Sequence, residues 1–568
     1  MVKMKDTLGS PALKTKLSEN TLNKATSGFK RFNILQNNND DGSANRRKSI
    51  IMDNEYESSE LNVSNTESES SEKEVVEPPR ELEEVEEVGK DKHVVTPKGL
   101  VETHDKRGRL VYKHVKTSKV RYKKDGQMRS NFGDLIFLPR YTIFDQEIYF
   151  GAKFFGFFVA IWLCVFFFGL NVILSYHTSQ GTFKNSEIVH LMLKDLWKVA
   201  LFDLTMYLSM YFSVFVQLCI KSQLIRWKPT GFTLQAIYEV LLLVCPFFYA
   251  DKLQLPWIAQ IFLMLHSVVM LMKVHSYAFF NGYLWEIKNE YEFSTLFMKK
   301  KDILEENIVS SLEKSIKFCQ DEIKSQSFPN NISFKNFFIY SMFPVLVYQS
   351  EYPRNDRIRA KYLFNKILGI FGVIFLMMVI SQHNLYPIVI ECLRLQKTTS
   401  IWYRIKVYPL ILIRIIPSFL SVYLLTFYLI WELILNALAE ITRFADREFY
   451  GYWWNSVNWN EYARDWNVPV HKFLLRHVYH SSISAFKVNK TVATFMTFFL
   501  SSIIHELAMY VIFKKVRFYL LLLQMSQLCL IQITNTKYLR NMNVFNNAIF
   551  WFGIIFGPSL MCTMYLVF

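Results

Sequence analysis

The sequence predicts an all-α protein that crosses a membrane many times and is preceded by a charged tail. The chain has 568 residues, of which 51% are hydrophobic and 16% are aromatic. Its mean hydropathy is +0.12, although 20% of its residues are charged. The apolar residues must therefore be concentrated in long runs, which excludes a soluble globule, a fibrous repeat and a wholly disordered chain.

Cysteine content and net charge limit the partners. The seven cysteines form no CxxC pair, so the sequence indicates neither a disulfide scaffold nor a zinc cluster. The net charge is +16. Because long apolar runs accompany this charge, anionic lipid headgroups or a phosphorylated cosubstrate are the expected partners, and nucleic acid is not.

The first 130 residues are patterned as blocks of charge. Residues 1–52 carry ten Lys and Arg, residues 53–87 carry fourteen Asp and Glu, and residues 90–130 carry thirteen Lys and Arg. Such blocks cannot bury enough apolar surface to offset chain entropy. We expect a disordered cytosolic tail over 1–130 and one membrane domain over 131–568. No apolar signal segment stands near the start, so the first span is expected to target the chain.

Beyond residue 150 the sequence contains about nine apolar stretches long enough to cross a membrane. A hydrocarbon core of ~30 Å requires about 20 helical residues, and β-strands cannot supply runs of this length and composition. The stretches are residues 152–176, 199–220, 232–250, 257–280, 362–390, 407–439, 491–513, 516–534 and 544–568.

Several of these stretches contain polar side chains. A charged side chain that faces lipid costs about 2.5–3.5 kcal/mol or more, so such residues are expected to face the bundle interior or a wet chamber. They are Asp203, Glu239, His266, Lys273, His275, Arg414, Glu432 and Asn436.

Basic loops predict the orientation. The segments 90–130 and 221–228 are rich in Lys and Arg, which places both on the cytosolic side. Lys514, Lys515 and Arg517 fall on the far side under a nine-span count and break the rule. Segments 287–325 and 330–348 are amphipathic, which is typical of helices that lie along the interface.

The segment 440–490 is too polar to span a bilayer and unusually rich in aromatic residues. Four tryptophans lie between Trp453 and Trp466, interleaved with Lys and Arg. Cations beside aromatic rings at a membrane surface suit a phosphate-bearing amphiphile, and a plain basic interfacial loop is the alternative.

His505 and Glu506 interrupt the apolar run that follows. Burial disfavours the imidazolium ion, so His505 should be neutral and able to accept a proton, although a structural buried histidine is the alternative. The pair does not complete the HExxH zinc motif because Met509 stands at the last position. His471, His477 and His480 do not share one helix face, so no metal site is predicted.

Spacing connects His505 with the membrane surface. If the helix is unbroken from Lys490, the fifteen residues to His505 span about 22 Å. Ser501 lies one turn before His505, on the same face. A surface cation and a neutral base at this separation match an extended pantetheine chain.

Several long motifs then resemble one family. HSYAFFNGYLW (275–285), FPVLVYQSEYPR (343–354), FYGYWWN (449–455), WNVPVHKFLLRHVYH (466–480) and SSIIHELAMY (501–510) resemble the sterol O-acyltransferase branch of the membrane-bound O-acyltransferase family, in particular its fungal enzymes. The resemblance covers roughly residues 150–568. It implies a multi-pass enzyme of the endoplasmic reticulum that esterifies the 3β-hydroxyl of a sterol from acyl-CoA, for storage in lipid droplets, and that forms homodimers or higher homo-oligomers.

The resemblance also implies site residues. His505 matches the catalytic base, and Trp466 and Asn467 match a pair at the reaction chamber. Further matching positions are Tyr479, Lys490 and Ser501 on the acyl-CoA path, and Phe449, Tyr450, Trp453, Trp454 and Asn455 in the FYxDWWN motif. Tyr452 replaces the Asp of that motif, a change expected either to open a buried polar network or to be compensated by the tyrosine hydroxyl.

These assignments predict direct acyl transfer in a ternary complex. His505 would act as general base, and Asn467 would either donate to the thioester oxygen or orient His505. No candidate nucleophile accompanies His505, since the nearest cysteine on neighbouring stretches is Cys529. Acyl-CoA is a cosubstrate, and no cofactor is expected. Two alternatives remain open: an acyltransferase for another acceptor, such as diacylglycerol, and a non-catalytic sterol-binding or transport protein.

Overall fold

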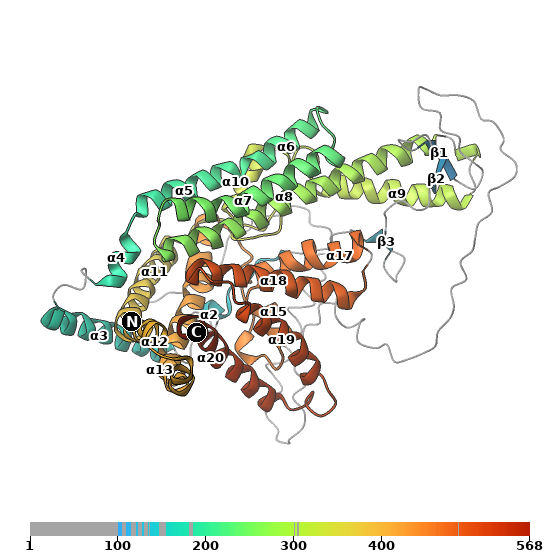
Figure 1. Cartoon of the computed structure of the whole chain (residues 1–568). Coiled ribbons are helices and arrows are strands. Elements are labelled where there is room, and N and C mark those ends of the chain that lie inside the picture. The colour runs from blue at the N-terminus through green and yellow to red at the C-terminus, as the bar shows by residue number, and fades with distance from the viewer. Residues whose placement is uncertain are drawn as a thin grey trace, which may run out of the picture. The chain divides into compact units, whose positions relative to one another are not determined.

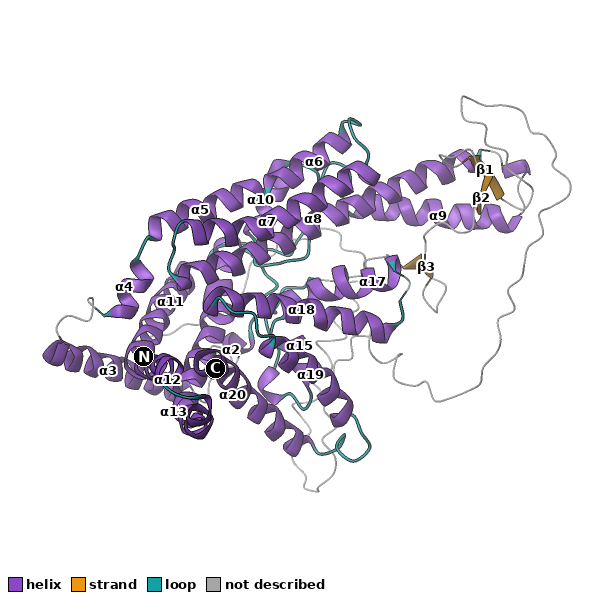
Figure 2. Cartoon of the chain, viewed as in Figure 1, coloured by secondary structure: helices purple, strands orange, loops and turns teal. Residues whose placement is uncertain are grey.

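The computed structural model describes residues 100–104, 110–114, 121–122, 128–129, 135, 137–146, 155–180, 186–299, 301–303, 306–486 and 488–568. All of them belong to one compact unit, Leu82–Phe568. Helices dominate this part of the chain (Figures 1 and 2).

Two short antiparallel hairpins precede the helices. β1 (Leu100–His104) pairs with β2 (Leu110–His114) over five residue pairs, and β3 (Arg121–Tyr122) pairs with β4 (Met128–Arg129) over two. The predicted tail, 1–130, otherwise lies outside the described residues. The disorder of the tail therefore stays a prediction.

The first group of helices ends near residue 342. It comprises α2 (Ile143–Asp145), α3 (Phe155–Gln180), α4 (Glu187–Leu193), α5 (Leu196–Ser209), α6 (Tyr211–Lys221), η4 (Trp227–Gly231), α7 (Phe232–Lys252), α8 (Trp257–Met298), η5 (Lys301–Ile303), α9 (Glu306–Ser325) and α10 (Phe334–Met342).

The second group carries the remaining motifs. It comprises α11 (Ala360–Ile380), η6 (Ser381–Leu385), α12 (Tyr386–Thr398), α13 (Ile401–Phe427), η7 (Tyr428–Ile434), α14 (Leu435–Ile441), η8 (Trp453–Asn455), α15 (Trp459–Asp465), α16 (Val468–Phe473), η9 (Leu474–Tyr479), α17 (His480–Ala485), α18 (Lys490–Phe513), α19 (Tyr519–Thr534) and α20 (Asn543–Val567).

Eight helices of the described chain are long and apolar enough to cross a membrane. They correspond to eight of the nine predicted stretches. The ninth, predicted over 516–534, is α19, whose 16 residues span only about 24 Å. The chain is therefore a multi-pass membrane protein, as the sequence predicted.

α8 is far longer than the predicted stretch 257–280. Its 42 residues measure about 63 Å, twice the thickness of a hydrocarbon core. The amphipathic helix α9 packs against α8. Residues 287–298, predicted as part of a separate amphipathic segment, instead continue α8.

A buried ionic network joins distant parts of the chain. The Lys366 ammonium on α11 donates to Asp145 on α2, at 3.1 Å, and to Glu432 on η7. Tyr362 donates to the second oxygen of Asp145 at 2.6 Å, and Tyr450 donates to the second oxygen of Glu432 at 2.7 Å. One lysine therefore connects α2, α11, η7 and the FYGYWWN segment.

A third carboxylate completes the charge balance. Glu440 on α14 accepts from the backbone N–H and the guanidinium of Arg359, at 2.6–3.1 Å, and also pairs with the buried Arg447. The guanidinium groups of Arg359 and Arg447 lie over the Tyr362 ring. This ring therefore lies between the ion pairs of Glu440 and the Lys366 network. Three carboxylates thus face three cations, which is the neutral arrangement that burial requires.

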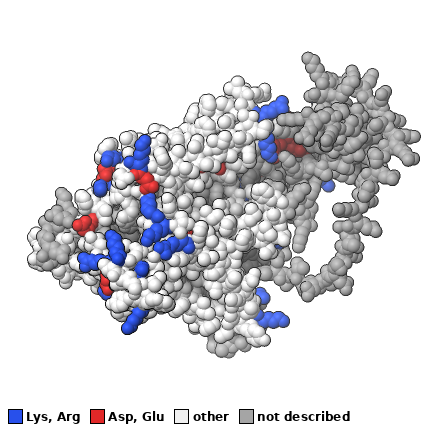
Figure 3. Space-filling model, viewed as in Figure 1, with Lys and Arg blue, Asp and Glu red and all other residues white. Residues whose placement is uncertain are grey.

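Figure 3 shows Lys and Arg gathered towards the left of this view, where α4, α12 and α13 lie, beside a largely uncharged surface.

Two of the three basic residues predicted to break the orientation rule, Lys514 and Arg517, have partners. The Lys514 ammonium donates to Asp251 and Gln260, each at 2.6 Å. Arg517 donates to the Phe568 carbonyl oxygen at 2.6 Å. Both cations therefore join helix ends.

Replacement of Lys366 by Met should destabilise the fold by about 3–5 kcal/mol, because two buried carboxylates lose their shared cation. Thermal unfolding in detergent measures this loss. The matched control is Glu292→Gln, which breaks an exposed pair with Lys288 and should change stability by about 0.5 kcal/mol or less. Equal melting temperatures for both variants would contradict the role assigned to the network.

Candidate active site

The predicted catalytic helix is continuous. α18 runs unbroken from Lys490 to Phe513, and the Asn489 side chain caps it by accepting from the Val492 N–H at 2.8 Å. Lys490 and His505 are therefore separated by about 22 Å along one axis. η9, which ends at Tyr479, packs against α18.

The His505 ring is held by its own helix. Nδ1 lies 2.8 Å from the Ser501 carbonyl oxygen, which can only accept, so Nδ1 must carry the proton. In the neutral ring, Nε2 then has the free lone pair. The sequence placed Ser501 on the correct face, but its backbone carbonyl makes this contact.

The environment of His505 is crowded but leaves the ring reachable. Protein atoms surround the side chain closely, while the residue still exposes part of its surface. Within the described chain, no hydrogen bond to Nε2 is present. An exposed ring with an open acceptor can meet a substrate, which a histidine in a packed core cannot.

Glu506 has a different role from its neighbour. Its carboxylate accepts from the Phe518 N–H at 2.7 Å, the Leu521 N–H at 3.2 Å and the Tyr565 hydroxyl at 2.5 Å. These contacts cap the start of α19 and attach α20. Adjacent helical residues point about 100° apart, so Glu506 is buried in the structure while His505 is exposed.

Asn467 is positioned by a helix start. Its Oδ1 accepts from the Val470 N–H at 3.2 Å and caps α16, while the Val468 N–H donates to the Phe449 carbonyl at 3.1 Å. Because the oxygen is engaged in the cap, the amide Nδ2–H is the group left to serve a ligand. In the described residues, no hydrogen bond joins Asn467 to His505.

Trp466 belongs to an aromatic cluster. Its ring stacks on Tyr423 at 5.1 Å and meets Phe427 and Trp453 at 4.7 Å each. Ring pairs with this geometry stabilise the fold beyond the free energy gained by burying their apolar surface. The structure therefore brings Trp466 and Trp453 together, whereas it shows no direct contact of either ring with His505 within the described part.

The FYGYWWN segment is a structural hub. Phe449 and Trp453 are buried, and the Trp454 carbonyl accepts from Asn547 and Trp551, each at 3.1 Å. Asn455 ends the short helix η8. Each of these contacts holds the segment against neighbouring helices.

Tyr452, the departure from the family motif, is at the surface. It is 49% exposed and contacts the Trp454 ring edge-on at 5.8 Å. It stands at the N-cap position of η8, where its side chain makes no capping bond. The Tyr452 side chain therefore makes no hydrogen bond in the described part of the chain, and the effect of the replaced Asp stays a prediction.

Most predicted intramembrane polar residues face partners. Glu239 accepts from Gln235 at 2.9 Å and contacts His275 at 3.0 Å, and the Lys273 ammonium donates to the Phe343 carbonyl at 2.7 Å. Two pairs keep more exposed surface than the Glu239–His275 pair, namely Asp203–His266 and Arg414–Glu391. For these pairs the prediction of an inward orientation was only partly correct.

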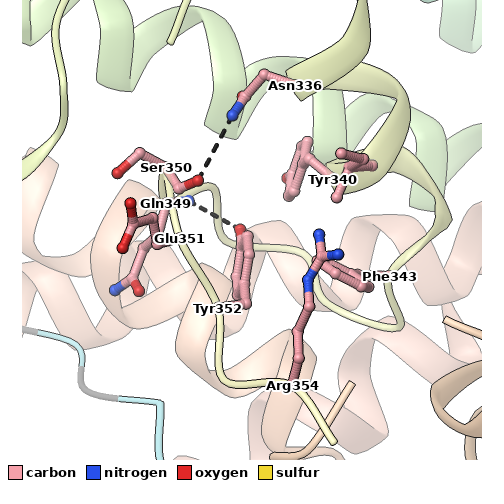
Figure 4. Close-up of a pocket in the computed structure, with 9 residues that line it drawn as sticks. Asn336, Tyr340, Phe343, Gln349, Ser350, Glu351, Tyr352 and Arg354 are labelled. Carbon is pink, nitrogen blue, oxygen red and sulfur yellow. Dashed lines mark hydrogen bonds between the residues drawn. The ribbon is translucent and has the colours of Figure 1, made fainter. Parts of the chain in front are cut away.

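One cavity lies away from the predicted site residues. It measures about 300 Å³ and lies between α10 and the segment 343–354 (Figure 4). The Arg354 guanidinium lies 5.1 Å over the Phe343 ring, and the Asn336 amide donates to the Ser350 carbonyl. This cavity is lined by none of the predicted site residues, among the residues that the structure describes.

Comparison with known proteins identifies the family. The model of the membrane-bound O-acyltransferase family matches residues 154–567. The chain belongs to the membrane-bound O-acyltransferase family. It is therefore a multi-pass acyltransferase, and α18 with its His505 lies within the matched region.

The chain is similar in sequence to several named proteins. Sterol O-acyltransferase 2 of Saccharomyces cerevisiae is 50% identical over 430 residues, 73% of this chain and 67% of the relative. Sterol O-acyltransferase 2 of Candida albicans is 44% identical over 484 residues, 77% and 79% of the two chains. Diacylglycerol O-acyltransferase 1 of Dictyostelium discoideum is 35% identical over 250 residues, 44% of this chain and 39% of the relative.

Acid should weaken the fold partly through His471. Burial, together with Arg464 and Lys472, lowers the pKa of His471 to about 4. In the unfolded chain the histidine pKa is ~6.5, so between these two pH values the unfolded chain binds up to one more proton than the folded chain. Stability therefore falls as the pH falls from about 6.5 to about 4, by up to roughly 3 kcal/mol from this residue.

Melting temperatures across this pH range measure the effect. His471→Gln should remove part of the acid-induced fall, whereas the control His190→Gln, at an exposed position, should retain it. Parallel curves for wild type and His471→Gln would show that His471 contributes nothing.

Proposed function

We propose that this chain is an acyl-CoA:sterol O-acyltransferase that transfers a fatty acyl group to the 3β-hydroxyl of a sterol. The observation that carries the proposal is the orientation of His505, whose Nδ1–H is bound by Ser501 so that Nε2 is open as a base. The sterol acceptor is supported by the two fungal relatives, which match far more of this chain than the diacylglycerol enzyme does.

The proposed reaction proceeds in one transfer step. Nε2 of His505 takes the proton of the sterol hydroxyl as the oxygen attacks the thioester carbonyl. The C–S bond then breaks, the ester is released, and the imidazolium returns the proton to the CoA thiolate. In the described chain, the cysteine on the neighbouring helix α19 is Cys529, which makes no hydrogen bond to His505, so we propose direct transfer without an acyl-enzyme.

Asn467 is proposed to stabilise the developing oxyanion. The Ser501 carbonyl already orients His505, which leaves the Nδ2–H of Asn467 to donate to the thioester oxygen. Lys490 and Tyr479 are proposed to line the CoA path near the beginning of α18, with Trp466 at the chamber. We propose that the enzyme works in the endoplasmic reticulum membrane as a homo-oligomer.

His505→Ala should lower kcat by about 10²–10⁴-fold, because a general base is lost. The measurement uses purified protein, labelled acyl-CoA and separate sterol and diacylglycerol acceptors. His383→Ala, which changes another histidine in a membrane-spanning helix, is the matched control and should retain activity.

Each outcome separates one alternative. Equal activity of His505→Ala and wild type would refute the proposed base. Ester formed on diacylglycerol alone would refute the sterol acceptor, and a wild type without transfer to either acceptor would favour the non-catalytic protein. A trapped acyl-protein would refute direct transfer.

A further inference from the structure

The Asp203–His266 pair is unusual among the polar contacts in the spanning helices. Asp203 on α5 and His266 on α8 meet at 2.5 Å between Oδ1 and Nδ1. Their side chains are 25% and 37% exposed. Titratable groups that keep exposed surface at membrane depth are costly and indicate function.

The surface around the pair is apolar. On α5, Leu204 is 51% exposed, and on α8, Phe262 is 49% and Leu265 is 50% exposed. The Phe262 ring also lies 5.7 Å from the His266 ring. A ligand of the pair therefore needs a large apolar body with one small polar group.

The neighbouring pair provides a contrast. Both carboxylate oxygens of Glu239 are engaged, one by Gln235 and the other by His275. At Asp203, only Oδ1 has a partner within the described chain, and Nε2 of His266 is not hydrogen-bonded there. The pair therefore offers one free carboxylate oxygen, Asp203 Oδ2, which can accept a hydrogen bond from the hydroxyl group of a lipid.

The pair lies close to the membrane level of the proposed catalytic base. His266 is nine residues after the start of α8, about 13 Å, and His505 is eight residues before the end of α18, about 12 Å. Lys514, at the end of α18, binds Gln260 in the first turn of α8, which sets the two helices in register. α8 and α18 also pack together.

We propose that Asp203 and His266 form a binding site for the hydroxyl group of a sterol that lies in the membrane against α5 and α8. The inference rests on the proposed function, because it takes the sterol as the hydroxylic lipid. A sterol held here carries its 3β-hydroxyl near the depth of His505. Asp203 Oδ2 accepts from the hydroxyl, while the contact between Asp203 Oδ1 and His266 Nδ1 holds the carboxylate in place.

Photolabelling of the full chain in detergent micelles tests the site without relying on activity. A photoreactive 3β-hydroxysterol should label peptides of α5 and α8, and excess unlabelled 3β-hydroxysterol should prevent it, whereas a 3-deoxy analogue should not. Asp203→Asn should reduce the labelling at least about tenfold, since a hydrogen bond to a charged acceptor is lost.

Two further variants keep the test independent of folding. The exchange Asp203→His with His266→Asp retains the pair and should restore labelling. Thr205→Val changes an exposed residue on the same helix, whose hydroxyl bonds only to the Leu201 carbonyl, and should label like wild type.

The proposal is overturned if wild type and Asp203→Asn are labelled equally, or if α5 and α8 are not labelled. It is also overturned if Asp203→Asn changes the oligomeric mass, because the pair would then contact a second copy of the chain. Steryl ester synthesis is measured on the same preparations. A wild type that makes no steryl ester contradicts the proposed function, whereas one that does so while Asp203→Asn keeps full labelling contradicts this inference alone.

Discussion

The fold depends on one constraint: charges inside the bundle must find partners inside the bundle, because the hydrocarbon core supplies no water. Lys366 satisfies this requirement for Asp145 and Glu432 at once. These residues come from three distant parts of the sequence, and Tyr450 links the same group to the FYGYWWN segment. The segment that leads into Trp466 and Asn467 is thus held in place by charge pairing as well as by aromatic packing.

The same constraint separates structural from functional polar groups. Glu506 accepts three hydrogen bonds and holds helices together, whereas His505 beside it makes one hydrogen bond, to the Ser501 carbonyl oxygen, and leaves Nε2 open. Glu239 and Asp203 differ in the same way, as one uses both oxygens within the protein and the other uses one. Groups with an unused hydrogen-bonding position at membrane depth are the ones to which we assign substrates.

The sequence predicted the helical class, eight of the spans and the continuity of α18, because hydropathy and spacing are local properties. It did not predict that α8 continues to Met298, since charged residues lower the hydropathy of a helix that extends beyond the membrane. It also could not place Tyr452 at the surface, because neither motif nor spacing reports exposure. The capping role of Glu506 depends on Tyr565 and Phe518, which only folding brings near.

The central claim is that Nε2 of His505 faces the acyl carbon of bound acyl-CoA. The most direct test is an experimental structure of the chain with an S-(2-oxoalkyl) analogue of acyl-CoA, which keeps the carbonyl but separates it from sulfur. We predict phosphates near Lys490, the pantetheine arm along α18 and the carbonyl between Nε2 and the Asn467 amide. A carbonyl bound away from His505, or a His505 ring turned so that Nε2 contacts only lipid, would contradict the account.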